Sequence, residues 1–233
     1  MEPNDKKQQA ENKETKELKK YPELQETTDK NVVKEPAVAY GNGRFTYEDY
    51  LSWTDDKMRE IINGFVYTFA APFRKHAKVT TFFTVIIGSF IRRRKSKGKC
   101  EIFHAPFDVR LSLTGETDDD KIHNVVQPDI CVVCDPSKLD DRGCLGAPDL
   151  IVEVQSPSTA KRDLDEKFHL YEQAGVCEYW VVFPKEKAVT VFLLQVDGKY
   201  NNGVTYEILN DDKKIPVQTL KGLVIDMDEL FED

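Results

Sequence analysis

The sequence lacks the long apolar runs of membrane proteins and the paired cysteines of small secreted domains. Its longest apolar stretch, residues 79–91, is interrupted by threonine and serine and is shorter than the roughly 20 residues of a membrane span. The first residues contain no apolar core of a signal peptide. The five cysteines are an odd set in a chain of 233 residues, which can bury a core without cross-links. We therefore expect a cytoplasmic protein without membrane contact, and reduced thiols.

Several nucleotide and hydrolase motifs are also absent. The sequence contains no Gly-x-x-x-x-Gly-Lys-Ser/Thr loop, no Gly-x-Gly-x-x-Gly turn and no Gly-x-Ser-x-Gly elbow. No segment of 20 to 50 residues repeats, which excludes solenoids and propellers. The net charge of −8 argues mildly against strong nucleic-acid affinity, although a local basic surface is still compatible with it.

Two regions differ in composition. Residues 1–35 are rich in Lys, Glu, Gln, Asn and Thr, which predicts a disordered or frayed tail. A solvated helix over residues 11–20 is the alternative, because Glu and Lys recur there at helical spacing. Residues 44–233 have the regular punctuation of a folded domain.

Within residues 44–233 the pattern alternates between strands and helices. Thr46 can cap a short helix over 47–53, and Asn63-Gly64 indicates a hairpin over 60–69. Apolar spacing predicts helices over 75–95 and over 160–174, the second ended by Gly175. The expected strands are 100–104, 108–113, 130–134, 150–154, 179–183 and 189–194. This order predicts one α/β or α+β domain with a mixed sheet flanked by helices.

Glu153 is a charged residue inside an otherwise apolar strand, which is costly unless another group compensates it. Asp149 shares its face but lies about 13 Å away along the strand. Asp129 is a better partner. If strands 130–134 and 150–154 pair antiparallel, opposed residues have position numbers that add to a constant, 282 for Asp129 and Glu153. That register would bring the two carboxylates together, where they could bind Mg²⁺ or Mn²⁺.

The following helix supplies a cation. Leu164, Lys167, Phe168 and Tyr171 lie near one helical stripe, so Lys167 borders the face that packs on the sheet. Two carboxylates, a divalent ion and a lysine are sufficient for phosphodiester hydrolysis, because the metal activates water and the lysine offsets negative charge.

These residues belong to a set of separated motifs that resembles the Uma family of restriction-endonuclease-like proteins, in the PD-(D/E)XK nuclease superfamily. The resemblance covers about residues 46–231. The motifs that carry it are Glu60 to Gly64, His76, Pro128-Asp129, Glu153-Val154-Gln155-Ser156-Pro157-Ser158, Asp163, Lys167, Tyr171, Gly175-Val176, Glu178-Tyr179-Trp180 and Gly222 to Phe231.

The resemblance implies a central mixed sheet flanked by helices, with Asp129 and Glu153 as metal ligands and DNA as the substrate. The superfamily pattern expects Lys where this chain has Gln155, and Lys167 on the next helix is the replacement we expect. Gln155 could still contribute its carbonyl oxygen to the site. Glu60 and His76 match family positions and are candidate accessory residues.

Each candidate has a structural alternative. Asp129 could stabilise a turn, Glu153 could lie on an exposed edge strand, and Lys167 could pair with Asp163 on the helix surface. Glu60 could be an ordinary exposed strand residue, and His76 a partly buried residue with a local hydrogen bond.

The basic run Arg92-Arg93-Arg94 could contact phosphates or could be a solvated helix end. Cys131 and Cys134 have metal-site spacing, but residues three apart in a strand point to opposite faces, which argues against a shared site.

Two functions remain open from the sequence. The first is a metal-dependent nuclease in which Asp129 and Glu153 hold the ion and Lys167 assists the attacking water. The second is a catalytically degenerate nuclease fold that serves as a binding or interaction module, which the missing lysine at 155 favours. A homodimer would suit an enzyme that cuts both DNA strands.

Overall fold

A computed structural model of the chain describes residues 44–55, 57–69, 73–94, 99–156 and 164–232. All of these residues belong to one compact unit. The predicted tail over 1–35 lies outside the described residues, as does the first part of the helix predicted over 160–174. The domain start at residue 44 therefore stays a prediction. Within the described part, no helix is both long and apolar enough to cross a lipid bilayer.

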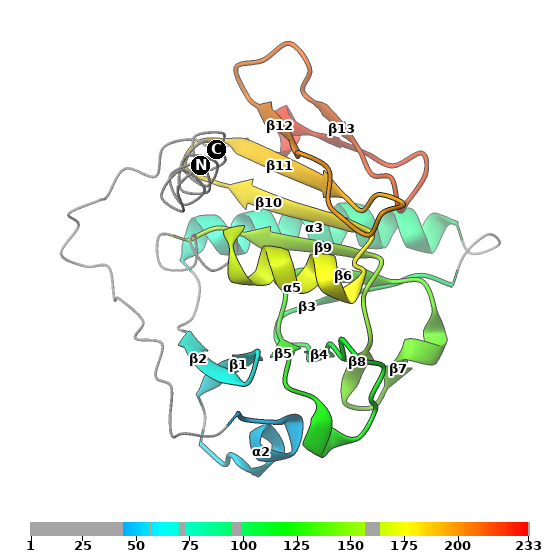
Figure 1. The fold of residues 1–233 in the computed structure, drawn as a ribbon. Coiled ribbons are helices and arrows are strands. Elements are labelled where there is room, and N and C mark those ends of the chain that lie inside the picture. The colour runs from blue at the N-terminus through cyan, green and yellow to red at the C-terminus, as the bar shows by residue number, and fades with distance from the viewer. Residues whose placement is uncertain (1–43, 56, 70–72, 95–98, 157–163, 233) are drawn as a thin grey trace, which may run out of the picture. The chain divides into compact units, whose positions relative to one another are not determined.

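The central sheet has six strands in the order β12-β11-β10-β9-β6-β3 (Figure 1). It is mixed, because β9 and β10 pair in parallel while all other neighbouring strands of this sheet pair antiparallel. Its strands are β3 (Glu101–His104), β6 (Ile130–Val133), β9 (Leu150–Val154), β10 (Glu178–Phe183), β11 (Ala188–Leu193) and β12 (Val204–Glu207). The predicted mixed sheet is confirmed.

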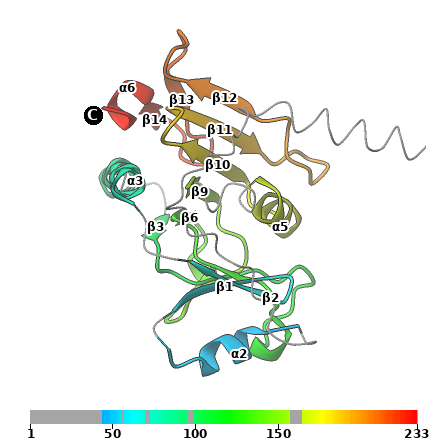
Figure 2. The same ribbon diagram turned by 90° about the vertical axis from the view of Figure 1, so that its left-hand side faces the viewer.

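Two helices, α3 (Arg74–Arg93) and α5 (Glu166–Ala174), lie on opposite faces of this sheet (Figure 2). The α3 face is apolar, since Val79, Phe83 and Ile87 pack with Leu150, Val152 and Val154 in one core. The α5 face therefore receives the other residues of β9, including Glu153. The predicted alternation along this strand is confirmed, and Gly175 ends α5 with a positive φ of 87°.

A second six-stranded sheet, β2-β1-β5-β4-β8-β7, lies below the central sheet in Figure 1. The predicted hairpin is its first pair, and Asn63 and Gly64 both have positive φ. A Cβ on Gly64 would lie 2.6 Å from Arg44 Cβ, so the turn requires glycine there. Its strands are β1 (Met58–Ile62), β2 (Phe65–Phe69), β4 (Val109–Arg110), β5 (Val125–Val126), β7 (Leu139–Asp140) and β8 (Gly143–Leu145).

The remaining elements are short. Helix α2 (Tyr47–Ser52) begins after Thr46, which makes the predicted cap as part of a capping box with Asp49. Near the C-terminus, β13 (Lys214–Pro216) pairs with β14 (Val224–Asp226), and α6 (Met227–Leu230) follows. Two 3₁₀ turns complete the set, η1 (Asp119–Lys121) and η2 (Pro136–Lys138).

The predicted register of β6 and β9 is confirmed. They pair antiparallel with Ile130 opposite Val152 and Cys131 opposite Ile151, and each pair of numbers adds to 282. The strand predicted over 108–113 is wrong in length, because only Val109 and Arg110 form β4. One further hydrogen bond, from Leu111 N–H to Asn124 O, follows the same register just beyond the strand.

The expectation of five reduced thiols is wrong for two cysteines. Cys100 and Cys134 form a disulfide between β3 and β6. These strands pair antiparallel with Glu101 opposite Val133, so Cys100 and Cys134, the adjoining residues of the two strands, lie opposite each other. Cys131, Cys144 and Cys177 are free. The prediction that Cys131 and Cys134 do not share a site is consistent with this pairing.

Candidate functional site

The candidate site forms where β9 ends, β6 begins and α5 covers the sheet. The end of β9 supplies Glu153, and the residue before β6 is Asp129. The first turn of α5 contains Lys167, while β1 of the second sheet contributes Glu60. The start of α3 supplies His76. In Figure 2 the starts of α3 and α5 flank the strands β9 and β6, with β1 below them.

Glu153, Lys167 and Glu60 form a buried ion-pair cluster. Lys167 Nζ lies 2.9 Å from Glu153 Oε1 and 2.8 Å from Glu60 Oε1. The three side chains are only 2–4% exposed. Tyr171, one helical turn after Lys167, donates its hydroxyl to the same Glu153 Oε1 at 2.7 Å. The edge-strand alternative for Glu153 is therefore wrong, since β9 lies inside the sheet and Glu153 is buried.

Burial and the nearby carboxylates act on Tyr171 in the same direction. Its side chain is fully enclosed, and desolvation, followed by the charges of Glu153 and Glu60, raises the pKa of its phenol well above the usual value. Tyr171 therefore stays a hydrogen-bond donor to Glu153 over the whole physiological pH range.

Asp129 has a second set of partners. Its Oδ2 accepts the backbone N–H of Val154 at 2.7 Å, so the carboxylate lies one residue from Glu153 along β9. His76 Nε2 lies 3.0 Å from the same Oδ2. This contact gives Asp129 a partner on α3, and it gives His76 more than the local hydrogen bond of the structural alternative. Both side chains keep partial exposure, 14% for His76 and 19% for Asp129.

Asp149 and Gln155, on either side of Glu153 along the chain, have partners of their own. Asp149 is turned to Cys134, whose backbone N–H it accepts at 2.7 Å, as expected for a residue outside the site. Gln155 follows β9 and donates its backbone N–H to Val182 O. Within the described residues, the buried Gln155 Nε2 has no hydrogen-bond partner. The alternative pairing of Lys167 with Asp163 involves a residue outside the described part.

Sequence reasoning missed two contributors. Tyr171 was placed on the same helical stripe as Lys167 and among the motif residues, but no role at Glu153 was assigned to it. Gln127 donates its backbone N–H to Glu60 Oε1 at 2.9 Å and its side-chain amide to Asp108 and to the Tyr50 hydroxyl. No local pattern indicates that role, because it depends on how β1 and β5 pair.

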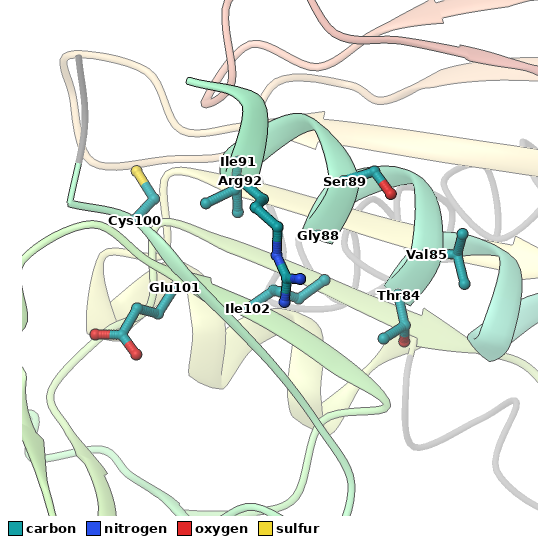
Figure 3. A pocket seen from close by; sticks show the side chains of 9 residues that line it. All are labelled: Thr84, Val85, Gly88, Ser89, Ile91, Arg92, Cys100, Glu101 and Ile102. Carbon is teal, nitrogen blue, oxygen red and sulfur yellow. The ribbon is translucent and has the colours of Figure 1, made fainter. Parts of the chain in front are cut away.

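The basic run lies far from these carboxylates. Arg92 and Arg93 are the last residues of α3 and Arg94 caps it, whereas His76 lies in its first turn. All three arginines are exposed, and none forms an ion pair with a described acidic side chain. A hollow of about 620 Å³ lies between this half of α3 and β3, and Arg92 reaches across it towards Ile102 (Figure 3). Thr84, Gly88 and Ser89 line its helix side.

The donor set was tested against a divalent ion. Among the residues that the structure describes, no three His, Cys, Asp or Glu side chains are grouped so that they could hold a metal. Mg²⁺ does not need such a cage, because it keeps several waters and binds through one or two carboxylates together with substrate phosphates. Asp129 and Glu153, neighbours across β6 and β9, provide hard oxygen atoms of that kind and fit this mode of binding.

Comparisons with known proteins identify the family and the fold. A family model described as "Putative restriction endonuclease" (Uma2) matches residues 47–228. "Uncharacterized protein slr1290" of a Synechocystis strain is 27% identical over 156 residues, which is 66% of this chain and 76% of that protein.

A crystal structure titled as "a putative nuclease belonging to DUF820" from Anabaena variabilis superposes with a TM-score of 0.62 and 18% identity. It covers 80% of this chain and 97% of its own, and at that identity the likeness shows the fold. Because the family model spans most of the chain, including all the site residues above, the protein belongs to the Uma2 restriction-endonuclease-like family.

Proposed function

We propose that the protein is a metal-dependent nuclease that hydrolyses phosphodiester bonds in DNA. The observation that carries the proposal is that Asp129 and Lys167 contact the last two residues of β9. Asp129 is bonded to Val154 N, and Lys167 Nζ lies 2.9 Å from Glu153. We take the inward direction of Lys167, towards Glu153, to favour an enzyme over an interaction module.

Asp129 and Glu153 would hold Mg²⁺ or Mn²⁺. The bound ion would lower the pKa of a coordinated water and polarise the phosphate. His76 and the Val154 amide fix one oxygen of Asp129, which orients the carboxylate. Lys167 would orient the attacking water or offset the charge that develops on the phosphate.

The basic end of α3 supports DNA as the substrate. Arg92, Arg93 and Arg94 carry three positive charges on a helix that contains no acidic residue, in a chain with a net charge of −8. We propose that they contact the phosphate backbone away from the scissile bond. A homodimer that acts on both strands and a cytoplasmic location belong to the same proposal.

Calorimetry and plasmid nicking test the function together. The wild type is titrated with Mn²⁺ and assayed on supercoiled plasmid beside Asp129→Asn and Glu153→Ala. Asp141→Asn, in an exposed loop, is the matched control for the loss of a carboxylate. We expect the two site variants to lose Mn²⁺ binding and at least about a hundredfold in nicking rate, and the control to keep both.

Two results would count against the proposal. Nicking that survives in both site variants would place the chemistry elsewhere. Mn²⁺ binding without nicking on plasmid or single-stranded DNA would favour the binding module, which Gln155 in place of the superfamily lysine also favours.

A further inference from the structure

The ammonium of Lys167 is shared between two carboxylates that come from different sheets. Glu153 belongs to β9 of the central sheet, and Glu60 to β1 of the second sheet. The distances are nearly equal, 2.9 Å and 2.8 Å. Each accepting oxygen also receives another donor, the Tyr171 hydroxyl on Glu153 Oε1 and the Gln127 N–H on Glu60 Oε1. Both carboxylates are therefore held in place independently of the lysine.

In this arrangement a divalent cation on Glu153 would have to compete with Lys167. The proposed metal ligand already has a full positive charge 2.9 Å from one oxygen, in a place that water scarcely reaches. A cation on the same carboxylate would be repelled by the ammonium, and at such distances the repulsion is strong in a partly desolvated site. The metal and Lys167 therefore compete for Glu153 unless the ammonium moves.

Glu60 can keep the Lys167 ammonium paired when it leaves Glu153. Its oxygen is already in contact with Lys167, and its position is fixed by the Gln127 backbone on the far side. A small shift of the flexible lysine stem towards Glu60 would release Glu153 and keep the ammonium paired. No exposure of a buried charge is needed for the exchange.

We propose that Lys167 is the internal counter-ion of the metal-free site, that it competes with the divalent cation for Glu153, and that Glu60 retains the ammonium when the cation binds. Glu60 is then a positioning residue for Lys167 and not a metal ligand. This inference rests on the proposed metal-dependent function, and it adds a mechanism that sets how tightly the site binds metal.

Substitutions at the two residues should change Mn²⁺ affinity in opposite directions. Lys167→Met removes the competing charge and keeps the length of the stem, so calorimetry should show binding tighter by about tenfold or more. Glu60→Gln removes the second anchor and leaves the ammonium on Glu153, so binding should weaken by about tenfold. Equal affinities in Lys167→Met and wild type would overturn the proposal.

The double variant separates an anchor from a ligand. If Glu60 acts only through Lys167, then Glu60→Gln in the Lys167→Met background should change Mn²⁺ affinity by less than about twofold. If Glu60 binds the metal, the loss should persist in that background, which would overturn its role as anchor. The double variant removes one buried carboxylate together with the ammonium. If Lys167→Met alone does not fold, the Mn²⁺ affinity of the double variant can therefore be compared directly with that of the wild type.

The same titrations distinguish this inference from the proposed function. Binding by the wild type that is lost in Asp129→Asn but is insensitive to Lys167→Met leaves the metal site standing and overturns the counter-ion. Binding that is detectable only after Lys167→Met supports the counter-ion. If neither protein binds Mn²⁺, both proposals fail. Circular dichroism of each metal-free variant confirms that it is folded before affinities are compared.

Discussion

Glu153 is the side chain on which both the stability of the site and its proposed activity depend. It is buried in a strand whose five residues are all buried, and it is tolerated because Lys167 and Tyr171 both donate to its Oε1. A buried charge that loses a partner is strongly destabilising, whereas a satisfied one is close to neutral. The residues around Glu153 should therefore affect stability as well as activity.

Tyr171→Phe should lower the free energy of unfolding by about 1–3 kcal/mol, because the buried carboxylate loses one donor while the ring remains in place. Urea unfolding of the two proteins measures the difference. Tyr206→Phe, at a half-buried position on β12, is the control and should change stability by less than about 0.5 kcal/mol. Equal effects of the two substitutions would show that the hydroxyl of Tyr171 does not support Glu153.

At the scale of elements, α3 connects two different surfaces. Its first turn places His76 beside Asp129, and its last turn carries exposed arginines beside the hollow along β3. From His76 to Arg92 the helix rises about 24 Å. A nucleic acid held at both ends would therefore extend over several nucleotides beyond the scissile bond.

Replacing Arg92 or Arg93 by Ala should weaken duplex binding and reduce the slope of log K against log salt by about 0.9 for each phosphate contact that is lost. Fluorescence anisotropy with a labelled 20-base-pair duplex at several salt concentrations measures both quantities. Lys185→Ala, an exposed basic residue in the turn between β10 and β11, is the matched control and should leave the slope unchanged. An identical slope in all variants would remove this end of α3 from the DNA surface.

The disulfide between β3 and β6 fixes an edge strand of the central sheet, and the free thiols differ in environment. Cys131 and Cys144 are buried, whereas Cys177 is exposed. Desolvation raises the pKa of the Cys144 thiol to about 11 and raises that of Cys131 further. Since the thiolate is the reactive form, a raised pKa lowers reactivity at a given pH.

Partial burial raises the pKa of the Cys177 thiol as well, but Cys177 alone of the three free thiols is exposed. Titration with a thiol reagent at pH 8 should therefore detect one thiol in the native protein that reacts faster than the other two, from Cys177. The unfolded protein should show three thiols before reduction and five after it, because Cys100 and Cys134 are released only by a reductant. Labelling of Cys144 should accelerate as the pH rises towards 11. Five thiols in the unfolded, unreduced protein would contradict the disulfide.

At the scale of the molecule, one apolar core joins segments that are far apart in the chain. It includes the inward face of α3, the strands of the central sheet and the C-terminal residues from Ile215 to Phe231. Phe83 of α3 packs edge-on against Trp180 of β10, with ring centroids 5.9 Å apart. This core fixes α3 on the sheet and thereby holds His76 at the site.

Phe83→Ala should lower the free energy of unfolding by about 3–5 kcal/mol, because it leaves a cavity between α3 and the sheet. Phe73→Ala tests the same change at the N-cap of α3, where the ring is 75% exposed, and should cost less than about 0.5 kcal/mol. Chemical unfolding of both variants checks the contrast. A small effect at Phe83 would mean that α3 is not held by this core.

Local signals were sufficient for much of the fold. The Thr46 cap, the Asn63-Gly64 turn, the apolar stripe of α3 and the Gly175 stop each depend on residues close in sequence, and each is present in the structure. The short strands β5, β7 and β8 were not predicted, because two or three residues carry no period and are fixed only by pairing with neighbours. The length of β4 was overestimated for the same reason.

The sequence by itself determined which residues could form a site and the strand register that relates two of them. Alternation along the strand placed Glu153 on the face opposite the apolar one. Opposed residues of two antiparallel strands have position numbers with a constant sum, and this register placed Asp129 beside Glu153. Only the tertiary structure decided the remaining partners. Glu60 reaches Lys167 from another sheet, His76 reaches Asp129 from the far face, and Cys100 meets Cys134 across 34 residues. Such contacts depend on how separate elements pack, and no local pattern in the chain encodes that packing.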